Sequence, residues 1–360
     1  MKKLFTFLSI ALCICLLAGC AGTPVIYHMD CDCSTNSNTN SSDQTSTVTS
    51  AEGELKTGLA IVTGIKESAS ATADKNGEGN YDVTMVAVLV DKDGIIRDCI
   101  IDGIATSVKF DATGKITSDL TKAPQTKNEL GDNYGMVAYG GAKAEWNVQA
   151  AALAKFAVGK TVKQLREGAV DETGKAPAGS DLASSATIYL GGYVSAIETA
   201  VAKATNLGAK SGDTLKMATV TAISSSASAT ADKAGTTQLD ATVTALTLKD
   251  GVITSCAIDA VQAKVNFDIT GKIPETTDLT AAVKTKNELG KDYGMVAWGQ
   301  AKFEWNEQAA SFAKYVTGKT PAQVAGIAVN EKTAPTEADL VATVTIAIGD
   351  FKTLIDKATK

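Results

Sequence analysis

The chain has 360 residues, of which 44% are apolar, so it is long enough and apolar enough to form more than one packed domain. Its 34 Lys and Arg against 40 Asp and Glu give a formal net charge of −6, which argues against a nucleic-acid-binding protein, since such proteins concentrate basic residues on one face. The single histidine, His28, lies before the part of the chain expected to fold, so that part can form neither a multi-histidine zinc site nor a histidine-based catalytic triad.

The first twenty residues predict export. Lys2 and Lys3 precede an apolar run over residues 4–17, which is short for a membrane span and typical of a signal peptide. Residues 17–20, Leu-Ala-Gly-Cys, resemble the lipobox of bacterial lipoproteins. The resemblance implies removal of residues 1–19 as a lipoprotein signal peptide, lipidation of Cys20 and anchoring at the extracytoplasmic face of the cell membrane. An ordinary signal peptide that contains a cysteine is the alternative.

Residues 20–54 are expected to form the lipid anchor and a disordered tether. Residues 34–53 are almost entirely Ser, Thr and Asn, without the apolar periodicity of a helix or strand. Cys31 and Cys33 lie beside His28 in a pattern that also occurs in soft-metal sites. We favour a disulfide with a partner or unstructured chain for these cysteines, and predict no metal site.

The rest of the chain contains the same segment twice. Residues 127–161 recur as residues 286–320 with 24 of 35 positions identical. The match extends to both sides of this block, so we place two tandem domains at residues 55–207 and 212–360. A period of about 150 residues is too long for a solenoid.

Each copy is predicted to begin with antiparallel strands. In the first copy, β-branched runs flank Asp93-Gly94, and the corresponding runs of the second copy flank Asp250-Gly251. Asp-Gly between such runs favours a tight hairpin turn in which both central residues have positive φ. Cys99 and Cys256 occupy matching strand positions, and we interpret them as buried packing thiols.

Two amphipathic helices are predicted in each copy. Over residues 145–158, apolar side chains recur at spacings of four, three and four, and the second copy repeats this pattern. A further helix closes each copy, near residues 193–204 and 351–358. The predicted class is therefore α+β, two tandem copies of an antiparallel-sheet domain with packed helices.

Two segments of the first copy carry a recognisable pattern. One is the loop Asn128-Glu129-Leu130-Gly131 followed by Tyr134, and the other is residues 181–187, Asp-Leu-Ala-Ser-Ser-Ala-Thr, before the last helix. Together they resemble the FMN-binding domain family, which includes flavin-bearing subunits of Rnf and sodium-pumping quinone reductase complexes and many surface lipoproteins. That family pairs a loop H-x-E-T-P-G-L-G with a later D-x-x-[S/T]-G-A-T.

The resemblance implies FMN esterified through its phosphate to threonine by a flavin transferase. Because the flavin supplies the redox chemistry, we assign no catalytic acid or base. The implied cofactor-binding residues of the first copy are Thr187, Asp181, Ser184, Ser185, Ala186, Glu129, Gly131 and Tyr134. Those of the second copy are Thr345, Asp339, Glu288, Gly290 and Tyr293. We expect Tyr134 or Tyr139 to stack on the flavin, with Trp298 in place of Tyr139 in the second copy.

The sequence departs from the family pattern at several positions. Ser185 stands where the family has glycine, and the loop lacks the family's histidine and proline. Val344 precedes Thr345, and we expect this larger side chain to crowd the turn. In the simpler interpretation, the threonines only begin β-branched segments and the loops are structural turns fixed by glycine geometry.

Two functional hypotheses follow. The first is a membrane-anchored extracytoplasmic flavoprotein that carries electrons through covalent FMN and receives them from a membrane redox partner. The second is a cofactor-free surface lipoprotein, a ligand-binding or structural module that acts through its Asn-Glu-Leu-Gly loops. Neither hypothesis involves nucleic acid.

Overall fold

The computed structural model describes residues 53–360. The predicted signal peptide, the lipidation of Cys20, the tether up to residue 52 and the Cys31/Cys33 pair lie outside the described residues. No helix among the described residues is long and apolar enough to cross a membrane.

The first half contains one three-stranded antiparallel sheet in the order β1-β2-β3, and its helices follow the strands in the chain. Its elements are β1 (Lys56–Gly64), β2 (Gly77–Val90), β3 (Ile96–Phe110), α1 (Lys127–Leu130), the 3-10 helix η1 (Gly131–Tyr134), α2 (Trp146–Ala157), α3 (Val162–Ala169), α4 (Asp181–Ser185) and α5 (Gly191–Ala202).

The second half repeats this arrangement with the antiparallel sheet order β4-β5-β6. Its elements are β4 (Thr214–Ala222), β5 (Gly235–Lys249), β6 (Val252–Phe267), α6 (Lys286–Leu289), the 3-10 helix η2 (Gly290–Tyr293), α7 (Trp305–Val316), α8 (Pro321–Ala325), α9 (Ala338–Val341) and α10 (Gly349–Thr359). The predicted α+β class and the predicted helices are confirmed.

The two hairpin turns differ, although the sequence predicts the same turn for both. In the second half Asp250 and Gly251 both have positive φ, at 50° and 76°, as a tight two-residue turn requires. In the turn of the first half, Gly94 has positive φ but Asp93 does not, so the prediction for Asp93 is wrong. The reason is a longer loop, in which the Asp91 side chain accepts hydrogen bonds from the backbone N–H groups of Asp93 and Ile95.

The two sheets pack face to face and share one apolar core. The inner faces meet through contacts of β1 with β6, β2 with β5 and β3 with β4. Buried side chains from both sheets, among them Met85 and Val243, form a single cluster. At one end the rings of Phe110 and Phe267 stack in parallel, with centroids 3.9 Å apart. The burial of both inner faces therefore depends on the presence of both halves.

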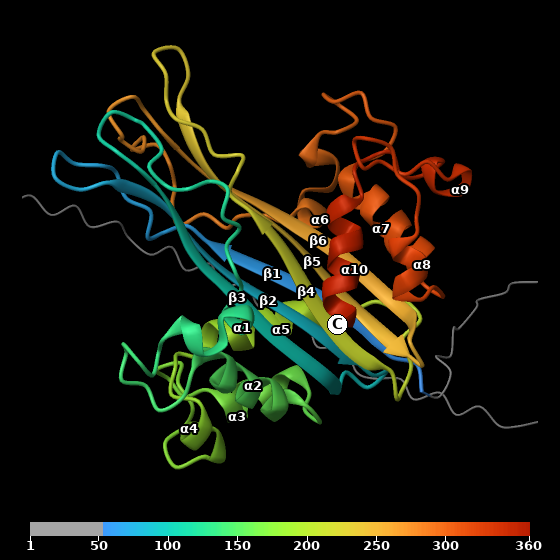
Figure 1. Ribbon diagram of the computed structural model, residues 1–360. Helices are drawn as coiled ribbons and strands as arrows, with labels where there is room; N and C mark the ends of the chain where they lie inside the picture. Colours follow the sequence, from blue (N-terminus) through green and yellow to red (C-terminus); the bar gives the residue numbers. More distant parts are fainter. Residues whose placement is uncertain (1–52) are drawn as a thin grey trace, which may run out of the picture. The chain divides into compact units, whose positions relative to one another are not determined.

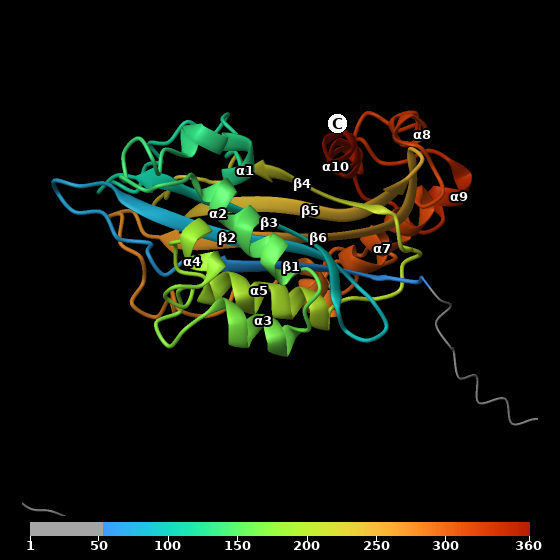
Figure 2. The same cartoon turned by 90° about the horizontal axis from the view of Figure 1, so that it is seen from below.

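Helices cover the outer face of each sheet. In the first half α2 packs on β3, and α5 packs on β1 and β2; in the second half α7 packs on β6, and α10 packs on β4 and β5. Figure 1 shows α2, α3 and α4 on one side of the paired sheets and α7, α8 and α10 on the other. Figure 2 shows the strands between these helical groups from below. This cover explains why β2 is buried on both faces from Met85 to Val90.

Contacts between the halves are reciprocal at the end of the sheets. The Ala71 N–H donates to the Gly271 carbonyl at 2.7 Å, and the Ala229 N–H donates to the Gly114 carbonyl at 2.8 Å. The described residues, 53–360, accordingly belong to one compact unit. The tandem copies are thus two halves of one structure, each of which completes the other's core.

Candidate functional site

Thr187 and Thr345 occupy equivalent positions in the two halves. Each lies in the short segment between a small helix, α4 or α9, and the last helix of its half. Both residues are exposed, so both threonines lie at the molecular surface.

A buried glutamine from the preceding long helix holds each threonine. The Gln149 Oε1 accepts hydrogen bonds from the N–H of Thr187 at 2.7 Å, from its hydroxyl at 3.2 Å and from the N–H of Ile188 at 3.1 Å. In the second half Gln308 accepts the same three bonds from Thr345 and Ile346. Because one side-chain oxygen fixes two consecutive backbone N–H groups, the position of each threonine is well defined.

The first turn of α2 also holds the loop that precedes it. The buried Glu145 carboxylate accepts hydrogen bonds from the N–H groups of Met136 and Val137 at 2.8 and 2.9 Å. Glu304 makes the equivalent pair of bonds in the second half. The start of α2 thus holds both the threonine segment and the residues that follow the predicted loop, although no hydrogen bond among the described residues joins Glu129 or Gly131 to Thr187.

The glutamates and glutamines of this turn were not among the predicted site residues. The sequence contains a signal for them, because Glu145-Trp146-Asn147-x-Gln149 is repeated as Glu304-Trp305-Asn306-x-Gln308. Their roles are visible only when the side chains are placed in space.

Val344 does not crowd the turn before Thr345, so that expectation is wrong. Its side chain is fully buried, as is Ala186 in the first half. The N–H of Val344 donates to Leu340 at 2.8 Å, the same distance as between Ala186 and Leu182. The larger side chain fills space in the core beneath the turn, and Thr345 keeps the same hydrogen bonds to its glutamine as Thr187.

The remaining residues of the threonine motif lie on or beside the short helices. Asp181 and Ser185 are exposed on α4, and the Ser184 hydroxyl donates to the Asp181 carbonyl at 2.7 Å. Asp339 is exposed on α9. Apart from Thr187 and Thr345, the exposed side chains of these motifs make no hydrogen bond to the glutamine.

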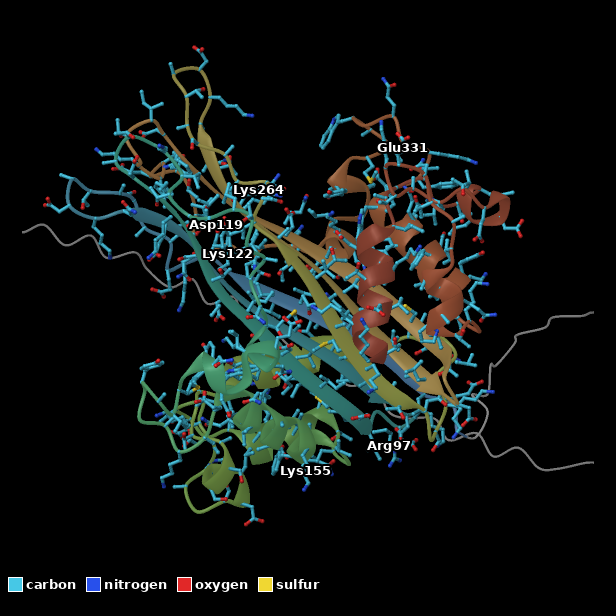
Figure 3. All side chains as sticks on the ribbon, in the orientation of Figure 1. Arg97, Asp119, Lys122, Lys155, Lys264 and Glu331 are labelled. Carbon is cyan, nitrogen blue, oxygen red and sulfur yellow. The ribbon has the colours of Figure 1, made fainter. Side chains whose placement is uncertain are left out.

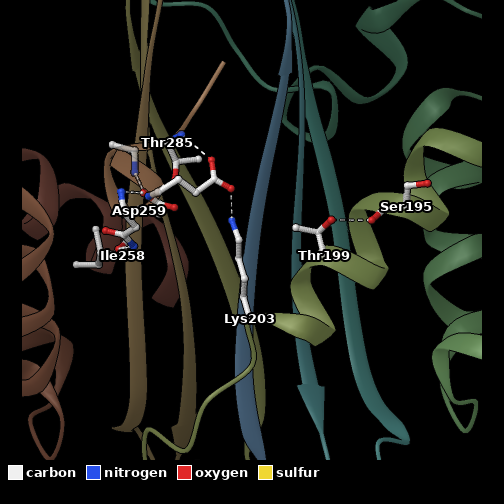
Figure 4. A network of polar contacts seen from close by, with 9 residues as sticks. Ser195, Thr199, Lys203, Ile258, Asp259 and Thr285 are labelled. Carbon is white, nitrogen blue, oxygen red and sulfur yellow. Dashed lines mark hydrogen bonds and ion pairs between the residues drawn. The ribbon is translucent and has the colours of Figure 1, made fainter. Parts of the chain in front are cut away.

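Glu129 and Glu288 serve two structural purposes. Each completes a capping box at the start of α1 or α6, with Thr126 or Thr285 as its partner. Each also forms an ion pair with the opposite half: Lys357 Nζ lies 2.5 Å from Glu129 Oε1, and Lys203 Nζ lies 2.6 Å from Glu288 Oε1. Figure 4 shows Lys203 directed from the end of α5 toward the region of Asp259 and Thr285.

These contacts set the protonation of the carboxylates in this region. Burial raises the pKa of Glu288, but the hydrogen bonds from Lys203 and Thr285 outweigh it and hold that pKa below its usual value. Nearby Asp259 behaves in the opposite way, because burial raises its pKa despite hydrogen bonds from the backbone N–H groups of Asn287 and Ala260. Asp102 is the equivalent residue of the first half, and burial raises its pKa as well.

Gly131 and Gly290 begin the 3-10 helices, and Tyr134 and Tyr293 end them. Tyr134 and Tyr293 are half-buried against the core, each with a lysine ammonium near its ring. Lys127 Nζ lies 5.4 Å from the Tyr134 ring centroid, and Lys286 Nζ lies 4.8 Å from that of Tyr293. Each tyrosine ring therefore already packs against the core and a lysine. Stacking of Tyr134 on a planar ligand would require this packing to open.

Tyr139 and Trp298 are the exposed aromatic residues of the same loops. They are 93% and 80% exposed, respectively. Their rings lie so close to Gly135 and Gly294 that a Cβ atom there would approach them to 2.6 and 2.2 Å. Both glycines have positive φ, so a side chain at either position would be strained as well as crowded. Each ring is thus backed by a glycine and presents its other face to solvent.

Two cavities occupy equivalent places beside β6 and β3. The larger, of about 970 Å³, is lined by Cys256, Asn287, Asn306 and Lys314; the smaller, of about 390 Å³, is lined by the equivalent Cys99, Asn128, Asn147 and Lys155. Figure 3 labels Lys155 on the outer, helical side of the first half. Neither cavity is lined by Thr187 or Thr345.

The two cysteines are free, buried thiols, as expected from their strand positions. Burial raises the pKa of each to about 12. At neutral pH both remain protonated, so they act as packing residues and not as nucleophiles.

The chain was also compared with known proteins. No protein-family model, no curated protein and no solved structure matches it.

Proposed function

We propose that this protein is a membrane-anchored, extracytoplasmic flavoprotein that carries electrons through FMN bound covalently to threonine. The observation that carries the proposal is the equivalent placement of Thr187 and Thr345, each exposed and each held by a buried glutamine. The anchoring rests on the lipobox-like residues that end at Cys20.

The surroundings of Thr187 suit a phosphate better than those of Thr345. Helix α5 begins a few residues after Thr187 with Gly191 and Gly192, has no acidic residue in its first turn, and leaves open space at Gly192. The equivalent of Gly192 in α10 is Asp350, whose negative charge lies at the same helix end. Because a helix N-terminus favours an anion and a carboxylate there repels one, we assign the preferred attachment to Thr187.

The other residues of the site would position the flavin ring and would not act as catalytic groups. Tyr139 has an exposed aromatic ring and lies in the loop that is hydrogen-bonded to Glu145. Glu145 is one helical turn before Gln149, which donates to the Ala144 carbonyl. Bound FMN supplies electron transfer by itself, which suits a site without a histidine or a reactive thiol. A flavin transferase and a membrane redox partner are the partners that this function requires.

The test is co-expression of the chain with and without a flavin transferase, followed by intact mass measurement and in-gel flavin fluorescence. We expect a mass gain of one FMN that requires the transferase and that is lost in Thr187→Val. Ser195→Ala, which removes an exposed alcohol on α5 outside the predicted motif, is the matched control and should keep the label. Thr345→Val should remove at most a minor second label.

Absence of any mass gain in the presence of an active transferase would overturn the proposal. The chain would then be the cofactor-free surface module. Glu129 and Glu288 are occupied by ion pairs between the halves, so binding through the Asn-Glu-Leu-Gly loops would have to use the exposed residues after them, such as Val137 and Tyr139.

A further inference from the structure

The larger cavity has the size of a ligand pocket and no role in the flavin proposal. It lies between β6, α7 and the segment that follows α5, so both halves contribute to its walls. Its volume of about 970 Å³ is in the range of pockets that hold drug-sized molecules. Neither Thr187 nor Thr345 lines it, so a ligand bound there would not take the place of an attached flavin.

Two differences between the halves favour the larger volume. Ala257 of β6 stands where β3 has Ile100, and each of these residues lines the cavity of its own half. The larger cavity is also lined by Leu59 of β1 and by Leu207 of the segment that joins the halves, and the smaller cavity has no counterpart of these residues in its lining. A smaller strand residue thus leaves space, and an additional wall encloses it.

Apolar side chains line much of the larger cavity. Leu59 and Ile258 are buried, Leu207 is half-buried, and Ala310 is exposed on α7. Ala313 lies one turn further along the same helix, so the side of α7 that faces the cavity carries small residues. Contact with these groups removes apolar ligand surface from water, which is the main source of affinity in such pockets.

The charged residues of this wall sum to zero. Lys203 and Glu288 form an ion pair at 2.6 Å, and the buried Asp259 carboxylate accepts hydrogen bonds from two backbone N–H groups. Lys314 is exposed on α7, so its ammonium group stays in water while its aliphatic part covers the cavity. Two positive and two negative residues leave no unbalanced charge that would select a charged ligand.

Most neutral polar side chains of the wall already have partners within the chain. Those that are hydrogen-bonded to other described residues are Thr57, Asn206, Asn287 and Thr317. The Oδ1 atom of Asn306 has no partner among the described residues, but it is buried and out of reach of a ligand in the cavity. A polar ligand would therefore lose hydration and gain few hydrogen bonds in return.

We infer from these features that the larger cavity binds a neutral, mainly apolar molecule, such as an alkyl or prenyl alcohol. Its hydrocarbon part lies against Leu59, Leu207 and Ile258, and the burial of this part supplies the affinity. A charged analogue of the same length gains no unpaired counter-ion in the wall and so binds less tightly. Binding is non-covalent and does not depend on attachment of flavin to Thr187.

The test uses residues 21–360 produced without lipidation and without a flavin transferase, a chain that contains every described residue. Nile red, a neutral dye that fluoresces in apolar surroundings, reports binding, and calorimetry gives the stoichiometry. We expect saturable binding at a single site. At neutral pH, octanol should displace the dye at about threefold to tenfold lower concentration than octanoate or octylamine. Because no flavin is attached in this experiment, its result is separate from the labelling of Thr187.

Two variants fill the cavity from different walls. Ala257→Ile introduces the residue that the first half carries as Ile100, and it should weaken dye binding roughly tenfold. Ala310→Phe fills the space from α7 and should have a similar effect; because Ala310 is exposed, the unfolding midpoint should not fall. Ala151→Phe is the matched control at the equivalent position of α2, beside the smaller cavity, and should bind the dye like the parent.

Several results would overturn the inference. One is the absence of saturable dye binding to the parent chain. Another is displacement by octanoate or octylamine at the same concentration as octanol or below it, which would mean that the site does not select a neutral ligand. A third is unchanged binding in both Ala257→Ile and Ala310→Phe, or an equal loss in Ala151→Phe, since either result would place the dye outside the larger cavity.

Discussion

Lys357 of the last helix lies 2.5 Å from Glu129 of the first short helix, and so joins the end of the second half to the first half. Lys203 and Glu288 make the reverse connection at 2.6 Å. Both glutamates are also the N3 residues of capping boxes, so each helix start is held by its own threonine and by a lysine of the other half. The residues that resemble a cofactor loop are therefore also the residues that lock the two halves together.

Lys357→Met should lower the free energy of unfolding by about 0.5 kcal/mol, because the pair is half-exposed and solvent screens it. Urea denaturation measures this change. Lys163→Met breaks an exposed pair within α3 and should change stability by less than about 0.3 kcal/mol. The reverse pair, Lys203 with Glu288, depends on pH because the pKa of Glu288 is lowered in the folded protein. The stabilisation by this pair is therefore present above the unfolded pKa and is lost as the pH falls through the folded pKa. An equal effect of both lysine variants would contradict a special role for the cross-half pairs.

The shared core predicts a single unfolding transition for the described part of the chain. Phe267→Ala removes one ring of the buried stack with Phe110 and should cost about 3–5 kcal/mol. Because the inner faces cover one another, Trp146 in the first half and Trp305 in the second should report the same midpoint. Calorimetry and the fluorescence of single-tryptophan variants measure the unfolding midpoint of each half. Two separate midpoints would mean that the halves fold independently.

A related experiment divides the chain. Residues 53–207 expressed alone would expose an apolar inner sheet face, so we expect this fragment to aggregate or to pair with itself. Co-expression with residues 208–360 should yield a soluble complex of the two. A soluble, monomeric first fragment would contradict the shared core.

Asp259→Asn should flatten the pH dependence of stability. The pKa of Asp259 is raised by burial, so its stabilising contribution is complete below the unfolded value of 3.8 and is lost as the pH rises through the folded pKa. Asparagine keeps an oxygen acceptor for the N–H groups of Ala260 and Asn287 without a charge to bury. Stability above about pH 5 should therefore rise relative to the parent, as measured by urea unfolding across pH.

The control for this prediction is Asp278→Asn. Hydrogen bonds from Thr280 lower the pKa of this exposed aspartate, so its contribution has the opposite sign and is lost as the pH falls. Asp259→Asn and Asp278→Asn should thus shift the pH profile in opposite directions. A parallel shift of both profiles would show that burial does not control the titration of Asp259.

Gln149→Leu should affect both stability and labelling at Thr187. It leaves the N–H groups of Thr187 and Ile188 without their acceptor and should cost about 2–4 kcal/mol. Gln164→Ala, at an exposed capping position of α3, should cost less than about 1 kcal/mol. If Thr187 carries FMN, Gln149→Leu should reduce the mass gain while Gln308→Leu preserves it. Equal labelling in all three variants would mean that Gln149 does not position the threonine.

The sequence predicts the local elements well because their signals are local. The spacing of Trp146, Ala150 and Leu153 identifies one buried helix face, and the repeated segment identifies a duplicated α+β unit. The hairpin of the second half also follows from Asp250-Gly251 alone. In the first half the side chain of Asp91 accepts hydrogen bonds from the backbone of the turn and changes its type. The Asp-Gly pair alone does not predict this interaction.

By itself, the sequence determined the repeat, the hairpin strands, the two long helices of each copy and the candidate threonines, since all of these depend on residues close together in the chain. Only the tertiary structure decided that the two sheets share a core, that Lys357 reaches Glu129, and that the Oδ1 of Asn306 is left without a donor. The physical reason is that an apolar pattern indicates which side chains are buried. It does not indicate which surface covers them. Met85 and Val86 are adjacent and both fully buried, yet one packs against the other sheet and the other against the helices of its own half.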